Sequence, residues 1–154
     1  MGLNTARHVY QYMKEIYQVY SYIDVKGKTI LDVGADFGLS PMHFINQGAS
    51  RVIAFSLEKQ KPWLAHPRIE WHRQKWDGDW HVCGVLKIDC EGCEYGRPVE
   101  WYLNGFKEFY IAIHKIKPEQ YSHFNYYKSR LSEVAKLVYV SKDGLEEVYV
   151  RGGK

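Results

Sequence analysis

The sequence predicts an α/β fold with a mostly parallel sheet and helices on both faces. Short runs rich in Val, Ile and Leu alternate with segments of helical periodicity, which is the pattern of successive β/α units. The run at 82–89 is nearly continuous in apolar residues, as buried parallel strands are. An Asp-Gly turn, a strong hairpin signal, separates the last two runs at Asp143 and Gly144. The sheet should therefore end in an antiparallel hairpin.

The expected elements follow one another without an internal repeat or a linker. Asn4 is a plausible N-cap for the first helix, and Pro62 and Pro67 leave room for at most one helical turn in 58–67. The strands are expected at 28–34, 51–55, 68–74, 82–89, 109–114, 136–142 and 146–151. The helices are expected at 4–22, from 41 to 47, at 94–104 and at 118–135.

The bulk composition indicates an ordinary globular chain. Its 154 residues are 45% hydrophobic and 25% charged, and we expect a single domain with an N-terminal helix (1–27), a core (28–115) and a helix with hairpin (116–154). No apolar run of 18 residues and no secretory signal are visible, so we expect a cytoplasmic location without a membrane partner. The formal charge of +3 permits an anionic partner without arguing for one. Three cysteines do not make a disulfide scaffold.

The segment 30–41 contains the most informative feature, a buried strand followed by a glycine turn and a helix start. Gly34 and Gly38 allow the backbone to turn tightly beside a ligand, while Ser40 suits an N-cap and Pro41 the first helical position. In a parallel sheet, ligands bind outside the carboxyl ends of the strands. Asp36 in the turn would repel a pyrophosphate but tolerate an ammonium or sulfonium group, which favours S-adenosylmethionine over NAD. A capping role for Asp36 is the alternative.

The order of elements resembles a class I S-adenosylmethionine-dependent methyltransferase with a Rossmann-like sheet. Two segments are similar to the FkbM methyltransferase family: Leu-Asp-Val-Gly-Ala-Asp-Phe-Gly at 31–38, and Leu-Lys-Ile-Asp-Cys-Glu-Gly-Cys-Glu at 86–94. The likeness covers about residues 28–115, and the chain would be a short, divergent member. Ser56 stands where the family usually has the Glu that binds the ribose hydroxyls, and Glu58, two residues on, could substitute for it.

The resemblance implies a set of cofactor-binding residues. Asp32 or Asp36 could face the ammonium group of the cofactor, and Trp76 and Asp77 could flank the adenine, although simple packing explains Trp76 equally well. The expected cofactor-binding residues are Asp32, Gly34, Ala35, Asp36, Phe37, Gly38, Ser56, Glu58, Trp76 and Asp77.

Asp89, Glu91 and His114 are the candidate catalytic residues. They follow two strands that neighbour each other in this fold, so they should share the rim toward which the transferred methyl group points. With an ordinary pKa of about 6.5, His114 suits a general base near neutral pH. A structural histidine is the alternative. The same three residues could instead bind a divalent metal, although nothing in the sequence fixes a ligand geometry, so we assign no metal site.

The cysteines suggest two further sites that we consider weaker. Zinc binding by His81, Cys83, Cys90 and Cys93 is disfavoured, because an extended 84–89 would separate Cys83 and Cys90 by roughly 23 Å. Cys90 and Cys93 also match a CxxC redox pattern at a strand-to-helix turn.

The sequence therefore predicts an enzyme that transfers a methyl group to a hydroxyl of a small molecule or glycan. A ribose 2′-O RNA methyltransferase is one alternative, with Asp89, Lys115 and Glu147 as three members of a tetrad and Lys14 as a guess for the fourth. Another alternative is a degenerate module that binds the cofactor or a partner, either as a homo-oligomer or as a subunit of a complex.

Overall fold

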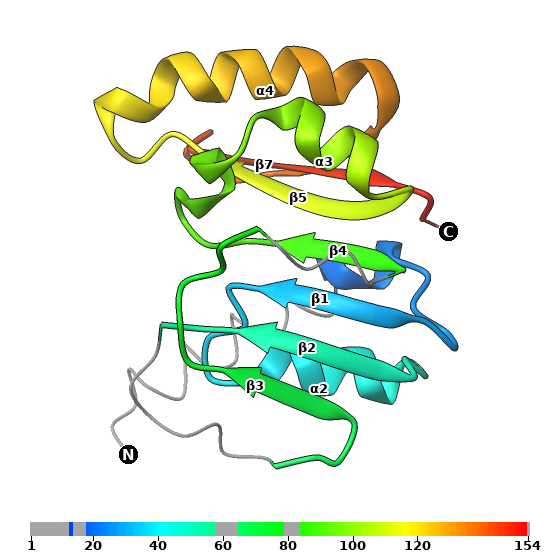
Figure 1. The fold of residues 1–154 in the computed structure, drawn as a ribbon. Coiled ribbons are helices and arrows are strands. Elements are labelled where there is room, and N and C mark those ends of the chain that lie inside the picture. The colour runs from blue at the N-terminus through cyan, green and yellow to red at the C-terminus, as the bar shows by residue number, and fades with distance from the viewer. Residues whose placement is uncertain (1–12, 14–17, 58–64, 79–83, 154) are drawn as a thin grey trace.

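The computed structural model describes residues 13, 18–57, 65–78 and 84–153. Their strands form one seven-stranded sheet in the order β3-β2-β1-β4-β5-β7-β6 (Figure 1). The strands are β1 Thr29–Val33, β2 Arg51–Phe55, β3 Ile69–His72, β4 Val85–Ile88, β5 Glu108–His114, β6 Lys136–Val140 and β7 Glu146–Arg151.

The direction of the strands confirms the predicted fold class. Strands β1 to β5 pair in parallel, whereas β7 is antiparallel to both of its neighbours, β5 and β6. The C-terminal hairpin therefore adds a single antiparallel strand, inserted between two strands that run the same way. Because the first five strands are parallel, their carboxyl ends meet at one edge of the sheet.

Helices cover both faces of the sheet, as expected. The longer ones are α2 Leu39–Asn46, α3 Val99–Gly105 and α4 Tyr121–Val134, and the short 3₁₀ turns are η1 Tyr20–Tyr22, η2 Cys93–Gly96 and η3 Pro118–Gln120. Successive strand residues point to opposite faces. Ile30 packs with the cluster that contains Phe44 of α2, while Leu31 packs with the cluster that contains Tyr102 of α3 and Phe124 of α4. Among the described residues, none of the helices has the length and apolar content needed to cross a bilayer.

The structure differs from the expected elements at two places, the helix expected at 94–104 and the start of α2. The helix expected at 94–104 is split into η2 and α3, because Pro98 at the N-cap of α3 interrupts it with an extended backbone. Ser40 is not the N-cap of α2: Gly38, in a left-handed conformation, takes that place, and Pro41 is the third helical residue. Most of the helix expected at 4–22, and most of the interrupted segment 58–67, lie outside the described residues.

Candidate functional site

A cleft of about 770 Å³ opens at the carboxyl ends of the parallel strands. It lies where a ligand is expected in an open α/β sheet, and its size is within the range of small-molecule sites. The turn after β1 forms one side of the cleft, and the segment after β4 and the β6–β7 turn contribute other parts of its lining. The predicted residues that line it are Gly34, Asp36, Phe37, Ser56, Trp76, Asp89, Glu91 and His114.

The glycine turn brings the backbone of β1 against the segment after β4. Gly34 has a φ of +83°, and a Cβ placed on it would lie 1.8 Å from the carbonyl oxygen of Asp89. Asp36, also left-handed with a φ of +42°, is exposed to the cleft, and Phe37 is 45% exposed beside it. Ala35 is fully buried and is not among the residues that line the cleft, and its N–H donates to the carbonyl oxygen of Phe55.

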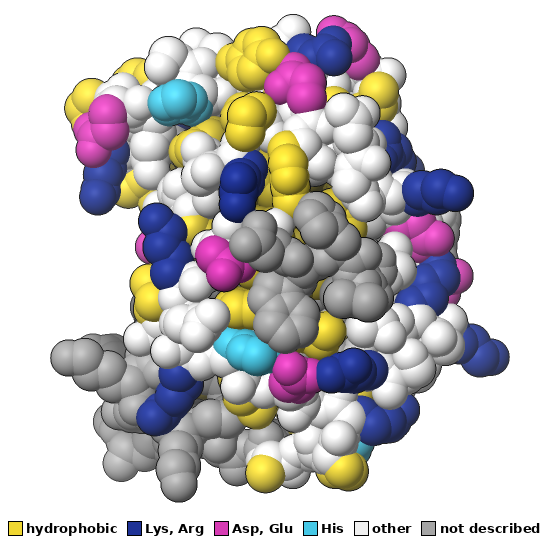
Figure 2. All heavy atoms as spheres, viewed as in Figure 1, with side chains coloured by type: hydrophobic (Ala, Val, Ile, Leu, Met, Phe, Trp, Pro, Cys, Tyr) yellow, Lys and Arg dark blue, Asp and Glu magenta, His cyan; other side chains and the backbone are white. Residues whose placement is uncertain are grey.

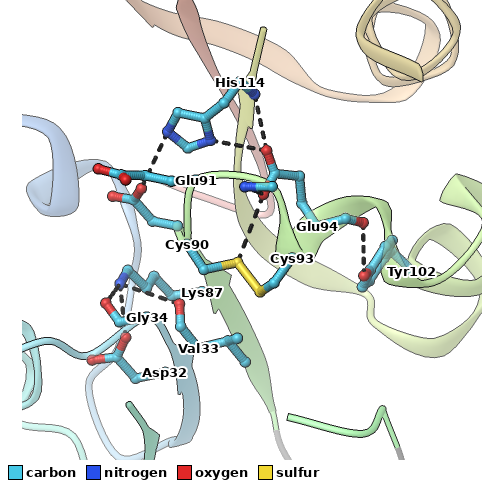
Figure 3. The surroundings of a disulfide bond; sticks show 12 residues. Asp32, Val33, Gly34, Lys87, Cys90, Glu91, Cys93, Glu94, Tyr102 and His114 are labelled. Atoms are coloured by element: carbon cyan, nitrogen blue, oxygen red, sulfur yellow. Dashed lines mark hydrogen bonds and ion pairs between the residues drawn. A yellow bond between two sulfur atoms is a disulfide. The ribbon is translucent and has the colours of Figure 1, made fainter. Parts of the chain in front are cut away.

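Asp32 does not lie in the cleft, contrary to expectation. It is fully buried, and its Oδ1 lies 2.9 Å from Nζ of Lys87, the residue opposite it on β4. Ser40 donates a 2.6 Å hydrogen bond to its Oδ2. Lys87 also donates to the carbonyl oxygen of Gly34 at 2.8 Å, as Figure 3 shows. Asp32 therefore anchors the turn from behind and is not among the residues that line the cleft.

Lys87 is a residue that the sequence reasoning missed. Its side chain is fully buried, and although burial lowers its pKa, the charges of Asp32 and Asp89 raise the pKa above the ordinary value. The signal that could have found it is a lysine within an otherwise apolar strand, at the position that pairs with a buried aspartate. A buried charge needs a partner, and the parallel pairing of β1 with β4 provides it.

Only some of the residues expected to bind the ribose and adenine of the cofactor line the cleft. Ser56 is buried and donates a hydrogen bond of 3.1 Å to the carbonyl oxygen of Asp36, so its hydroxyl ties two lining segments together. Glu58 lies outside the described residues. Trp76 lines the cleft but is 8% exposed and packs edge-on against Trp101, which supports a packing role. Asp77 is exposed and lines a smaller adjoining hollow.

Two of the three candidate catalytic residues, Asp89 and His114, lie side by side in the structure, next to a glutamate that the sequence analysis did not single out. His114 Nε2 lies 3.6 Å from Asp89 Oδ1 and 4.0 Å from Glu146 Oε1. We call Asp89, His114 and Glu146 the rim cluster. Glu91 is exposed with a left-handed φ of +55° and lines the same cleft. Glu146 reaches His114 because the two residues pair directly across β5 and β7, and no signal in the sequence distinguishes it from the neighbouring Glu147.

A buried carboxylate fixes the ring of His114. Glu94 is fully buried, and its Oε1 lies 2.9 Å from both the backbone N and the Nδ1 of His114 (Figure 3). Burial alone would lower the pKa of His114. The hydrogen bond to Glu94 and its negative charge outweigh burial and, with the other two members of the rim cluster, raise the pKa to about 9. The ring is therefore cationic at neutral pH, unlike the neutral base that its ordinary pKa suggested.

Cys90 and Cys93 form a disulfide with a Cα–Cα distance of 5.5 Å. It closes the turn between β4 and η2 and lies between the His114–Glu94 pair and the Lys87–Asp32 pair in Figure 3. The disulfide is compatible with the CxxC redox pattern. It is not compatible with both of these sulfurs binding zinc as thiolates. Cys83 and His81 lie outside the described residues.

Among the described residues, the three candidate members of the ribose methyltransferase tetrad do not come together. Glu147 points away from the cleft, because its carboxylate accepts hydrogen bonds from Lys128 at 2.5 Å and from Tyr149 at 2.6 Å. The ammonium group of Lys115 lies over the ring of Phe124. On the face in Figure 2, basic and acidic side chains are interspersed instead of forming one broad basic patch. Lys14 is outside the described part of the chain.

Comparisons with known proteins place the chain beside viral proteins in sequence and methyltransferases in fold. No protein-family model matches it, so the FkbM resemblance stays a prediction. It is 29% identical to Uncharacterized protein 65 of Sulfolobus islandicus filamentous virus (isolate Iceland/Hveragerdi), over 88% of this chain and 87% of that protein. The 1,6-didemethyltoxoflavin-N1-methyltransferase of Burkholderia thailandensis is 14% identical with a TM-score of 0.62, over 98% of this chain and 83% of that one.

The structural likeness, at this low identity, shows the class I methyltransferase-like fold alone. Sequence similarity goes further for a second viral protein, Uncharacterized protein 158B of Sulfolobus islandicus rod-shaped virus 1. The two are 31% identical over 113 residues, which cover 67% of this chain and 71% of that protein. The chain therefore belongs to the same protein family as Uncharacterized protein 158B.

Proposed function

We propose that the protein is an S-adenosylmethionine-dependent methyltransferase, of the kind found in the FkbM family, that acts in the cytoplasm on a hydroxyl oxygen of a small molecule or glycan. The observation that carries the proposal is the joining of two features in one cleft. The glycine turn after β1 lines one part of it, and Asp89 and His114 of the rim cluster line another. A methyltransferase needs a cofactor site and a proton acceptor side by side.

The residues of the cleft fit this cofactor. Asp36 would provide negative charge for its ammonium group, and Phe37 offers an apolar surface. The tight turn at Gly34 sets the lining close to the end of β4. When bound, the cofactor would supply an activated methyl group.

Asp89 is the best candidate for accepting the proton of the hydroxyl. Its side chain is 25% exposed at the cleft, and Tyr20 donates a 2.9 Å hydrogen bond to Oδ2, which leaves Oδ1 on the side of His114. His114 already carries a proton at neutral pH, so it acts by charge and position. Glu91, exposed on the same lining, would contact the acceptor.

Calorimetric titration with S-adenosylhomocysteine tests the cofactor site. Asp36→Asn removes the charge while keeping the shape, and Asn tolerates the left-handed backbone well. We expect micromolar binding to the wild type and roughly tenfold weaker binding to this variant, about 1.4 kcal/mol. Asp143→Asn, on the opposite part of the lining, is the matched control and should bind as the wild type does.

Methyl transfer from labelled cofactor to a panel of hydroxyl acceptors tests the activity. Asp89→Asn should abolish transfer while leaving S-adenosylhomocysteine affinity nearly unchanged. Full activity in this variant would remove Asp89 from the reaction. No binding of S-adenosylhomocysteine at millimolar concentration to folded protein would instead favour the degenerate module, in which a partner or a second copy of the chain completes the site.

A further inference from the structure

The rim cluster has a spacing of ligand atoms that can hold a metal ion. The separations of 3.6 Å and 4.0 Å from His114 Nε2 to the two carboxylates exceed hydrogen-bond lengths. One oxygen of Asp89, one of Glu146 and a ring nitrogen of His114 all lie within 4.8 Å of one another. Ligands held about 2.1 Å from one ion stand roughly 3.0–4.2 Å apart, so only a small contraction would close the site around it.

The ring of His114 is oriented as metal-binding histidines usually are. A ligating histidine typically donates its other ring N–H to a carboxylate, which fixes the ring and strengthens the ligand. Here Nδ1 lies 2.9 Å from the buried Glu94, whose other oxygen accepts the N–H of Gly92 at 2.7 Å. This partner is fixed within the protein, so Nε2 is presented to the two carboxylates.

The two carboxylates are also positioned by independent elements. Tyr20 donates to Oδ2 of Asp89 and so leaves Oδ1 for the cluster. Glu146 lies beside His114 because the two residues pair directly across antiparallel strands. The side chains of Asp89 and Glu146 are 25% and 24% exposed, so solvent can reach the site from the cleft.

We propose that Asp89, His114 and Glu146 bind one divalent cation whose remaining coordination positions open into the cleft. Two carboxylates and one imidazole suit the harder first-row ions, of which Mn²⁺ is the example we use. The two carboxylate charges balance those of the ion, and the ion takes the place of the proton on Nε2. If the proposed function holds, an acceptor hydroxyl would occupy an open position, where the ion would orient it.

Titration of metal-depleted full-length protein with Mn²⁺ alone tests this site, by calorimetry and by the loss of the free-Mn²⁺ electron paramagnetic resonance signal. Mn²⁺ is preferable to Zn²⁺, because thiolates released from the Cys90–Cys93 disulfide would compete for zinc. We expect one ion per chain. Glu146→Gln and Asp89→Asn should each weaken binding roughly tenfold or more, and Asp143→Asn, which alters a carboxylate of the same cleft outside the cluster, should not.

Two results would overturn the proposal: no saturable binding at millimolar Mn²⁺ to wild-type protein that circular dichroism shows to be folded, or unchanged affinity in Glu146→Gln. Because neither cofactor nor acceptor is present, the outcome is separate from that of the methyl-transfer experiments. Metal binding without cofactor binding would support this site and refute the methyltransferase proposal. Cofactor binding without metal binding would support the methyltransferase proposal and refute this site.

Discussion

Replacing Gly34 by alanine should destabilise the protein far more than the same change at Gly144. Both glycines have left-handed backbones, with φ of +83° and +68°. An L-residue in that region costs about 1–2 kcal/mol. A Cβ on Gly144 meets nothing within 4 Å, so this conformational cost is the whole effect expected there.

At Gly34 the added Cβ meets backbone that cannot easily move. It would lie 1.8 Å from the carbonyl oxygen of Asp89, and this oxygen would have to retreat by about 1.2 Å to reach the 3.0 Å below which such contacts are essentially never seen. The N–H of Asp89 donates a 3.0 Å hydrogen bond to Val33, which that retreat would break. Breaking this bond costs about 1 kcal/mol and repacking about 1–3 kcal/mol.

The expected difference between the two variants is therefore about 2–4 kcal/mol, with Gly34→Ala the less stable. Urea unfolding followed by circular dichroism measures this difference. A Gly34→Ala variant that is already unfolded without urea would also agree with the prediction. Equal free energies of unfolding would refute the claim that this turn is held against the end of β4, and with it the geometry proposed for the cleft.

Three further predictions concern groups around the cleft and the helix behind it. Lys87→Met should lower the free energy of unfolding by about 3–5 kcal/mol because Asp32 stays buried without its cation, and adding Asp32→Leu should recover much of the loss; no recovery in urea unfolding would contradict the pairing. Reducing the Cys90–Cys93 disulfide should lower the free energy of unfolding by about 2 kcal/mol, because the loop that it closes is short. A variant with serine at both positions should show the same free energy of urea unfolding with and without reductant. Burial lowers the pKa of His43, so the unfolded chain binds its proton first, and stability should decline as pH falls below about 6.5. His43→Gln should flatten that decline, and an unchanged pH profile would show that His43 does not cause it.

The strands were predictable because each is a short apolar run that must be buried. The parallel order also followed, since helical segments separate the runs and a parallel connection requires a crossover. The hairpin at Asp143 and Gly144 was readable from local turn chemistry, and Gly144 has a positive φ, a conformation that glycine adopts readily. These features depend on neighbours in the sequence, and a single chain displays them directly.

The site was harder to predict because its members meet only after folding. Nothing near Glu94 in the sequence shows that it will be buried against His114, twenty residues on. Glu146 and Glu147 are adjacent and chemically alike, and only the pairing of β7 with β5 decides that the first joins the rim cluster. The motif that contains Asp32 marks the turn, but only the folded structure shows that the side chain of Asp32 faces the buried Lys87.

The insertion of β7 between β5 and β6 makes the rim cluster the last part of the sheet to be completed during synthesis. Strand β6 leaves the ribosome before β7, yet β6 pairs with β7 in the sheet and must wait for it. Only β7 brings Glu146 to His114. Domains generally fold as units while the chain emerges from its N-terminus. A nascent chain that has not yet released β7 would therefore have the glycine turn and Asp89 but no rim cluster, so the proposed metal binding would report that β7 has joined the sheet.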